Sequence, residues 1–104
     1  KQHYAVGYVN AAGEKALFYV DFVIRMKNGQ VFLFDTKSIG SDGDAPAKHN
    51  ALIDYMASSE NKDKNLKGGV IIADGDNWKY SPLKIDNTTD IVNWDCFYPS
   101  DYKN

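Results

Sequence analysis

Two apolar stretches joined by a short turn constrain the fold of this chain most strongly. Residues 19–25 and 32–37 both have the composition of β-strands. Three charged residues, Asp21, Asp35 and Lys37, occupy positions that an ordinary strand fills with apolar side chains. Burying a charge in a sheet is costly unless the charge is paired or bound to a metal. The three charges therefore indicate a functional site.

The register of this hairpin decides whether the two aspartates can cooperate. A two-residue turn at 28–29 would place Asp21 and Asp35 on opposite faces of the sheet. A three-residue loop at 27–29, with Gly29 left-handed in a G1 bulge, would set them directly opposite each other. The residues permit either turn. We expect the three-residue loop, because it gathers both carboxylates and the lysine on one face.

Two carboxylates at that spacing favour a hard divalent cation. Without one, the pair repels and one member takes up a proton. Mg²⁺ prefers oxygen ligands and keeps several waters, and Lys37 beside it could orient a water or stabilise a developing negative charge. This set of groups suits hydrolysis of a phosphodiester. The alternative, non-functional interpretation is a surface ion pair, because Asp-x-Lys is a common pattern in solvated strands.

The sequence lacks the residues that other kinds of catalytic or binding site require. No Ser-His-Asp or Cys-His set is evident, and two histidines with one cysteine cannot supply a zinc site of the usual kind. There is no phosphate-binding loop of the Walker type and no GxGxxG. No basic helix or aromatic stacking platform stands out, so direct readout of bases is not expected.

Length and composition bound the class of protein. The 104 residues, 43% hydrophobic and 25% charged, predict one soluble domain spanning 1–104. No apolar run reaches the roughly 18–20 residues of a transmembrane helix, so no membrane partner is expected. The lone Cys96 fits a reducing cytoplasm and is expected in the core. A net charge of −2 argues against a stand-alone nucleic-acid binder. We interpret the chain as a domain excised from a longer protein.

The pattern along the chain predicts a mixed-sheet α/β fold. The first three strands should form an antiparallel meander, with the second covered on both faces in the middle of the sheet. A helix with one apolar stripe then leads to a strand parallel to the third. The expected elements, in order, are strands at 3–9, 15–26 and 30–37, a helix at 46–60, a strand at 70–73 and an edge strand at 78–85.

Asp21 followed by Asp35-Thr36-Lys37 resembles the motif of the PD-(D/E)xK nuclease superfamily, over about residues 3–74. More narrowly, the hairpin is similar to the C-terminal endonuclease domain of the Res subunit of type III restriction enzymes. The resemblance implies a restriction-endonuclease-like sheet flanked by helices. It also implies a Mg²⁺-dependent endonuclease (Mn²⁺ as substitute) that cleaves double-stranded DNA in the cytoplasm. The implied partners are a helicase-like motor region of the same parent chain and a modification subunit.

The same resemblance implies a role for each site residue. Asp21 and Asp35 match the two metal-binding acids, and the carbonyl of Thr36 often helps to bind the metal. Lys37 matches the catalytic lysine. Lys48, near the start of the helix, matches a position that often faces the catalytic site, although a solvated lysine of the first turn is an equally good interpretation.

Several positions depart from the family pattern. Val20 replaces the usual Pro, Asp35 replaces the commoner Glu, and Ser38 stands where Gly is usual. The first helix of the family, which often adds an acidic ligand, is missing; it was either lost or lies upstream of Lys1. This gap bears on the activity of the fragment more than on its fold.

Two other functions stay open. One is a non-catalytic docking or nucleic-acid-binding module on the same fold, in which the acids and the lysine form a closed ion pair. The other is a nuclease of the same superfamily that acts in repair or on RNA. Outside the motif, His49 is expected on the surface, and Asp42 and Asp44 are expected as loop and capping residues.

Overall fold

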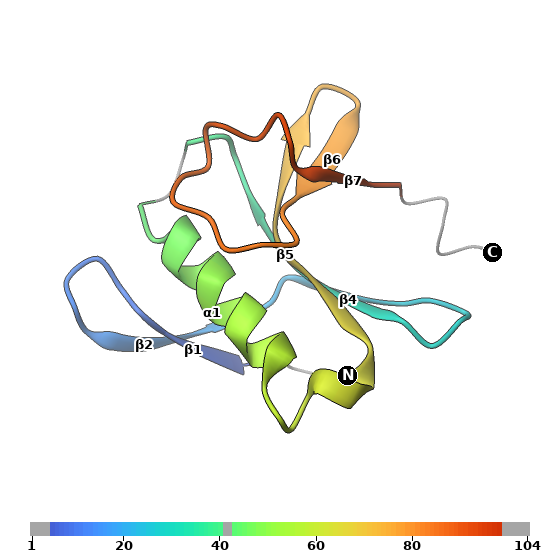
Figure 1. The fold of residues 1–104 in the computed structure, drawn as a ribbon. Helices are drawn as coiled ribbons and strands as arrows, with labels where there is room; N and C mark the ends of the chain where they lie inside the picture. The colour runs from blue at the N-terminus through green and yellow to red at the C-terminus, as the bar shows by residue number, and fades with distance from the viewer. Residues whose placement is uncertain (1–4, 41–42, 99–104) are drawn as a thin grey trace.

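The computed structural model describes residues 5–40 and 43–98 and contains two sheets and one α-helix in that part of the chain (Figure 1). Strands β1 (Ala5–Val9) and β2 (Lys15–Tyr19) pair antiparallel as a separate hairpin. The larger sheet has, in spatial order, β3 (Phe22–Arg25), β4 (Val31–Lys37), β5 (Leu66–Asp74), β6 (Asn77–Tyr80) and β7 (Asp95–Phe97). The predicted mixed α/β class is confirmed.

The crossover from β4 to β5 has the predicted direction. It passes through helix α1 (Ala45–Ala57) and a short 3₁₀ turn η1 (Lys62–Lys64), and β5 lies parallel to β4. The other neighbours in the sheet pair antiparallel. The expected edge strand at 78–85 is wrong in its extent, because β6 ends at Tyr80 and a loop with Pro82 follows.

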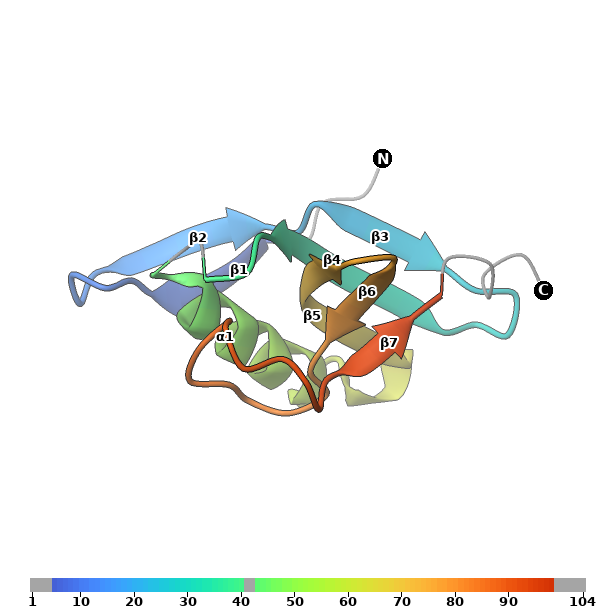
Figure 2. The same cartoon turned by 90° about the horizontal axis from the view of Figure 1, so that it is seen from above.

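The single strand expected at 15–26 is interrupted at residues 20–21. β2 pairs with β1 whereas β3 pairs with β4, and Figure 2 shows the two hairpins extending in opposite directions. The expectation that this segment lies mid-sheet with both faces covered is therefore wrong. β3 is an edge strand, and the side chains of Leu17 and Phe22 are exposed. Along β2 the side chains alternate between exposed and at least partly buried, as in a strand covered on one face.

The hairpin between β3 and β4 has the predicted three-residue loop. The N–H of Gly29 donates to the carbonyl of Met26 at 3.1 Å, and the N–H of Met26 donates to the carbonyl of Gln30 at 2.7 Å. Gly29 has φ +92°, a left-handed conformation that a side chain would strain. The loop therefore sets the register in which Phe22 lies opposite Phe34.

Helix α1 covers one face of the structure with its predicted stripe. Pro46 lies in its first turn, where the missing N–H is not needed. Leu52, fully buried, packs with Leu33 of β4 and with Val6 and Phe18 of the β1–β2 hairpin. The other predicted stripe residues, Ala51, Tyr55 and Met56, pack against the same cluster. We call this side of the sheet the helix face.

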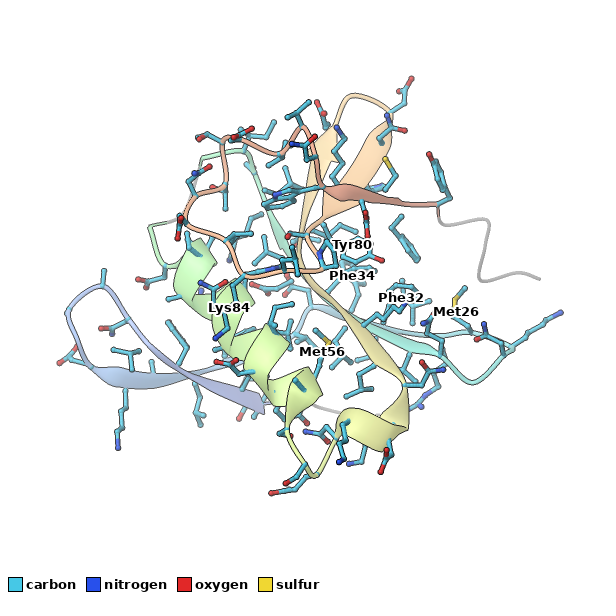
Figure 3. All side chains as sticks on the ribbon, viewed as in Figure 1. Met26, Phe32, Phe34, Met56, Tyr80 and Lys84 are labelled. Carbon is cyan, nitrogen blue, oxygen red and sulfur yellow. The ribbon has the colours of Figure 1, made fainter. Side chains whose placement is uncertain are left out.

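The opposite side, which we call the open face, consists largely of aromatic side chains. Phe32 and Phe34 of β4 contact Tyr80 of β6 and Phe97 of β7, with ring centroids 4.9–6.1 Å apart (Figure 3). No α-helix of the described residues covers this face, so the expected flanking by several helices is wrong for that part of the chain. Along the strands of the open face, the apolar side chains recur at every second residue, which is the period of β-structure. No helix in the described ranges has the length and hydropathy to cross a membrane.

Candidate functional site

The register of the β3–β4 hairpin brings the two predicted acids together. Phe22 pairs with Phe34, so Asp21, one residue earlier, and Asp35, one residue later, both lie directly beyond the last residue pair of this ladder. The N–H of Asp21 donates to the carbonyl of Phe34 at 2.9 Å, so the backbone just before β3 stays bonded to β4 but leaves the regular register. The two carboxyl groups lie close enough for each to shift the pKa of the other. The predicted geometry of the pair is therefore present.

Thr36 holds the Asp21 carboxylate in place. Its backbone N–H and its hydroxyl both donate to Asp21 Oδ2, at 3.0 and 2.9 Å. The N–H and the carbonyl of a strand residue point to the same side of the strand. The carbonyl of Thr36, the predicted third ligand, therefore points toward Asp21.

Asp35 is buried in a way that leaves one oxygen unsatisfied. Its side chain faces α1, between Asp21 on the β3 side and the fully buried Val70 on β5, and the residue is 5% exposed. Its Oδ2 accepts no hydrogen bond from any described residue. Lys37 Nζ lies 3.5 Å from that oxygen, which makes a long ion pair. A buried carboxylate oxygen without a hydrogen bond is unfavourable and marks a position where a cation would be stabilised.

Burial and mutual repulsion separate the pKa values of the two acids. Burial raises the pKa of Asp35 to about 6, and the adjacent Asp21 raises it as well, although Lys37 opposes the rise. Partial burial alone would raise the pKa of Asp21, but the two hydrogen bonds from Thr36 outweigh it and hold that pKa below its ordinary value. The pair thus shares one proton, carried by Asp35, in mildly acidic solution.

Lys48 lies close enough to the pair to act on it electrostatically. Its charge lowers the pKa of Asp35. Its Nζ lies over the rings of Tyr8 and Phe18, 5.6 and 6.0 Å from their centroids. These rings orient the lysine by cation–π attraction. The structure therefore brings Asp21, Asp35, Thr36 and Lys37 together near the start of β3 and the end of β4, whereas Lys48 lies on α1 with its charge over the rings of Tyr8 and Phe18.

The expectation that His49 lies on the surface is wrong. The ring is 0% exposed, because it packs parallel to Trp94 with centroids 6.1 Å apart. Nδ1 accepts the N–H of Val70 at 3.0 Å, and Nε2 lies 2.9 Å from the carbonyl of Leu83, to which it can donate. Burial lowers the pKa of His49, so the neutral Nε2–H form fits both bonds. A Cβ on Gly69 would overlap the imidazole.

Three further predictions concern residues outside the acid pair. Asp44 stands at the N-cap of α1, as expected, but makes no side-chain capping bond there. Its Oδ1 instead accepts the N–H of Ala11 at 2.9 Å, which ties the β1–β2 turn to the helix. Cys96 is half-buried in β7 rather than in the core. The prediction for Asp42 lies outside the described residues.

The residues of the acid pair fit a hard divalent cation. Asp21 and Asp35 supply carboxylate oxygens, Thr36 supplies a carbonyl on the same side, and Asp35 Oδ2 receives no hydrogen bond from any described residue. Mg²⁺ typically binds one or two carboxylates and retains waters, so a pair is sufficient. In residues 5–40 and 43–98 no group of three or more acidic, histidine or cysteine side chains gathers as a metal site. The donor set therefore suits Mg²⁺ or Mn²⁺ better than zinc.

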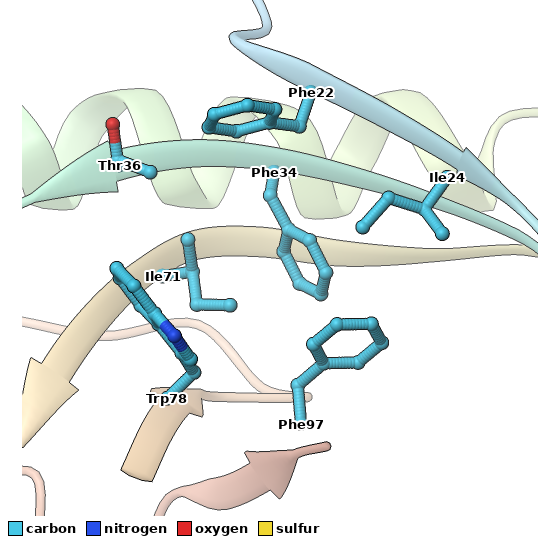
Figure 4. Close-up of a pocket in the computed structure, with 7 residues that line it drawn as sticks. All are labelled: Phe22, Ile24, Phe34, Thr36, Ile71, Trp78 and Phe97. Carbon is cyan, nitrogen blue, oxygen red and sulfur yellow. The ribbon is translucent and has the colours of Figure 1, made fainter. Parts of the chain in front are cut away.

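The sequence analysis missed an aromatic groove on the open face. Phe22, Phe34, Trp78 and Phe97 line a cavity of about 220 Å³ together with Thr36 (Figure 4). Phe22 and Ile24 are two residues apart along one strand, and so are Phe32 and Phe34 along the next. This spacing would have indicated an apolar strand face rich in aromatic rings. Nothing in the sequence places Trp78 or Phe97 beside them, because this depends on how β6 and β7 pair.

Comparisons of the chain with protein families, with curated proteins and with solved structures found no match.

Proposed function

We propose that this chain is a Mg²⁺-dependent endonuclease domain that hydrolyses phosphodiester bonds of double-stranded DNA. The observation that carries the proposal is the acid pair. Asp21 and Asp35 face each other across a hairpin, and a buried Asp35 oxygen lacks a hydrogen bond but lies 3.5 Å from Lys37 Nζ. A structural ion pair needs neither the second acid nor the unsatisfied oxygen.

Each group of the site has a distinct role in this proposal. Asp21, kept ionised by Thr36, and Asp35, which gives up its proton as the pH rises above about 6, would hold the metal with the Thr36 carbonyl. When bound, Mg²⁺ supplies charge stabilisation and lowers the pKa of a bound water. Lys37 would orient the attacking water or stabilise negative charge on the phosphate. Lys48, steadied by two rings, would add positive charge where the phosphate binds.

The wider setting is proposed from the resemblance of the motif. The antiparallel β3–β4 hairpin, the α1 crossover and the parallel β5 support a restriction-endonuclease-like core. We place the domain in a cytoplasmic restriction system of the type III Res kind. Its partners would be a helicase-like motor region of the parent chain and a modification subunit.

Cleavage of DNA by the protein that contains this chain tests the proposal. We expect plasmid cleavage that requires Mg²⁺ or Mn²⁺. Asp21→Ala, Asp35→Ala or Lys37→Ala should each lower the rate by at least about a hundredfold, because metal and charge stabilisation supply several kcal/mol. Asp90→Asn, at an exposed position on another loop, is the matched control and should cleave normally. Normal cleavage by a variant that carries all three substitutions would overturn the assignment of the site.

A second candidate function is a non-catalytic module that kept the fold. The ion pair between Lys37 and Asp35 favours it, since a closed pair of this kind would stabilise a site that binds no metal. Metal binding separates the two functions, because the module would bind neither Mg²⁺ nor Mn²⁺.

A further inference from the structure

The groove on the open face has exposed aromatic walls and a buried floor. Phe22 is 54% exposed and Trp78 is 38% exposed, whereas Phe34 between them is 1% exposed. Figure 4 shows Phe22 and Trp78 on two sides of the cavity, with Phe34 and Ile71 between them. The walls are therefore flat ring faces that water can reach, on a rigid base of strands.

The groove extends toward the end of β4 that bears Thr36 and Lys37. A second hollow of about 420 Å³ shares Thr36 and Trp78 with it and extends to Lys37 at the end of β4. The hydroxyl of Thr36 donates to Asp21 Oδ2 at 2.9 Å. The aromatic groove thus ends one hydrogen bond away from Asp21, the exposed member of the acid pair, and beside Lys37, whereas Asp35 faces α1 on the other side of the sheet.

A ligand that fits both ends must combine two chemistries. Its part in the groove must be flat and apolar, and its part at Asp21, Asp35 and Lys37 must be anionic and able to share a metal. The volume of about 220 Å³ falls below the roughly 300–1,000 Å³ of sites for drug-sized ligands, so it suits one planar ring system. One nucleotide of a nucleic acid has this combination of base and phosphate.

We propose that the groove stacks one unpaired base of the DNA strand whose phosphate lies at the acid pair. This inference rests on the proposed function. A base that stays paired inside a duplex cannot reach a groove in the protein, so the preferred DNA is single-stranded or distorted at the cleavage position. Stacking on aromatic rings accepts every base, so the groove sets the form of the DNA and not its sequence.

Binding of a short oligodeoxythymidine tests the stacking directly. With a single-stranded probe and Mn²⁺ we expect quenching of Trp78 fluorescence, and about tenfold weaker binding when one base is removed to leave an abasic position. Trp78→Ala should weaken binding of the intact probe about tenfold, whereas Trp78→Phe should restore most of it. Phe22→Ala provides a second groove variant in case Trp78→Ala loses the fold. Leu17→Ala, at an exposed apolar position of β2 that is 65% exposed, should bind normally.

Cleavage assays separate this inference from the proposed function. If both hold, a duplex with one unpaired thymidine is cut faster than the fully paired duplex, and Trp78→Ala removes the difference. If metal-dependent cleavage is present but the groove variants bind and cut as the parent does, the stacking inference is overturned and the nuclease proposal stands. If the probe binds through the groove but no DNA is cut with any metal, the nuclease proposal fails instead. Binding of a protein segment in the groove, with no effect of the abasic position, also overturns the inference.

Discussion

The two faces of the five-stranded sheet are both apolar but have different surroundings. On the helix face, α1 and the loop of residues 81–94 bury Leu33, Val70 and Ile72 almost completely. On the open face, Phe22 and Trp78 remain accessible beside a buried floor. The covered face can therefore perturb the chemistry of a charged group, and the uncovered face offers area for a ligand.

The acid pair lies where the two faces meet. Asp35 faces α1 and loses water, whereas Asp21 at the start of β3 is exposed and reaches around the sheet edge to Thr36. One acid is thus strongly desolvated and the other is not. This difference in environment, rather than the residue type, separates their pKa values.

The variant with the largest expected effect disrupts the close packing of the helix face. Gly69→Ala adds a Cβ that overlaps the His49 ring, at a residue whose φ of +140° already disfavours a side chain. We expect a loss of about 4 kcal/mol in the free energy of unfolding, measured by urea denaturation. Gly75→Ala is the matched control, because its φ is also positive but its Cβ would meet no atom within 4 Å. A loss no larger than about 1 kcal/mol, as in the control, would show that the ring is not held in place.

The next effect concerns the cost of ionising Asp35. Its pKa is about 6 in the folded chain against an ordinary 3.8, so this group stabilises the fold below pH 4 and the contribution is lost as pH rises through 6. That difference corresponds to about 3 kcal/mol. Asp35→Asn, which carries no charge, should therefore gain up to this amount of stability relative to the parent between pH 4 and 7. Thermal unfolding at several pH values measures it.

The measurement of stability against pH needs a control variant and has one result that would contradict the prediction. Asp90→Asn, at an exposed position, should run parallel to the parent protein at every pH. If the stability of Asp35→Asn equals that of the parent at every pH, or falls below it as pH rises, then Asp35 is not desolvated in the fold.

The smallest effect is expected at Phe22 and tests whether the open face is uncovered, with Phe34 as the buried reference. Phe22 and Phe34 are paired across β3 and β4 on that face, but only Phe34 is buried. Phe22→Ala should cost less than about 1 kcal/mol, and Phe34→Ala about 3–5 kcal/mol. Denaturation of the two variants side by side checks this. Equal losses would indicate that the two rings are equally covered.

How much the sequence predicts depends on whether the signal is local. Asn28-Gly29 predicts the turn but allows two registers, and the observed one was expected because it gathers the charges. The parallel direction of β5 follows from the crossover helix, and both predictions are confirmed. The juxtaposition of Asp21 with Asp35 depends only on that register. The part of the candidate site that lies on one hairpin was therefore predictable.

Non-local packing accounts for most of what was missed. The break at residues 20–21 depends on which strand each half pairs with, and the open face depends on the absence of a cover in the described part of the chain. His49 had a local signal that was overlooked. It lies on the same helical stripe as Leu52 and Met56, at spacing i, i+3 and i+7. A polar residue on a buried stripe requires partners, and Val70 and Leu83 provide them.

Titration with Mg²⁺ and Mn²⁺ by calorimetry tests the central claim, that the Asp21–Asp35 pair is a metal site. We predict binding that strengthens as pH rises to about 6, because the metal displaces the proton of Asp35, with release of about one proton per metal below that pH. Binding should disappear in Asp35→Asn and persist in Asp90→Asn. Absence of binding to the parent protein, or equal binding to Asp35→Asn, would contradict the account.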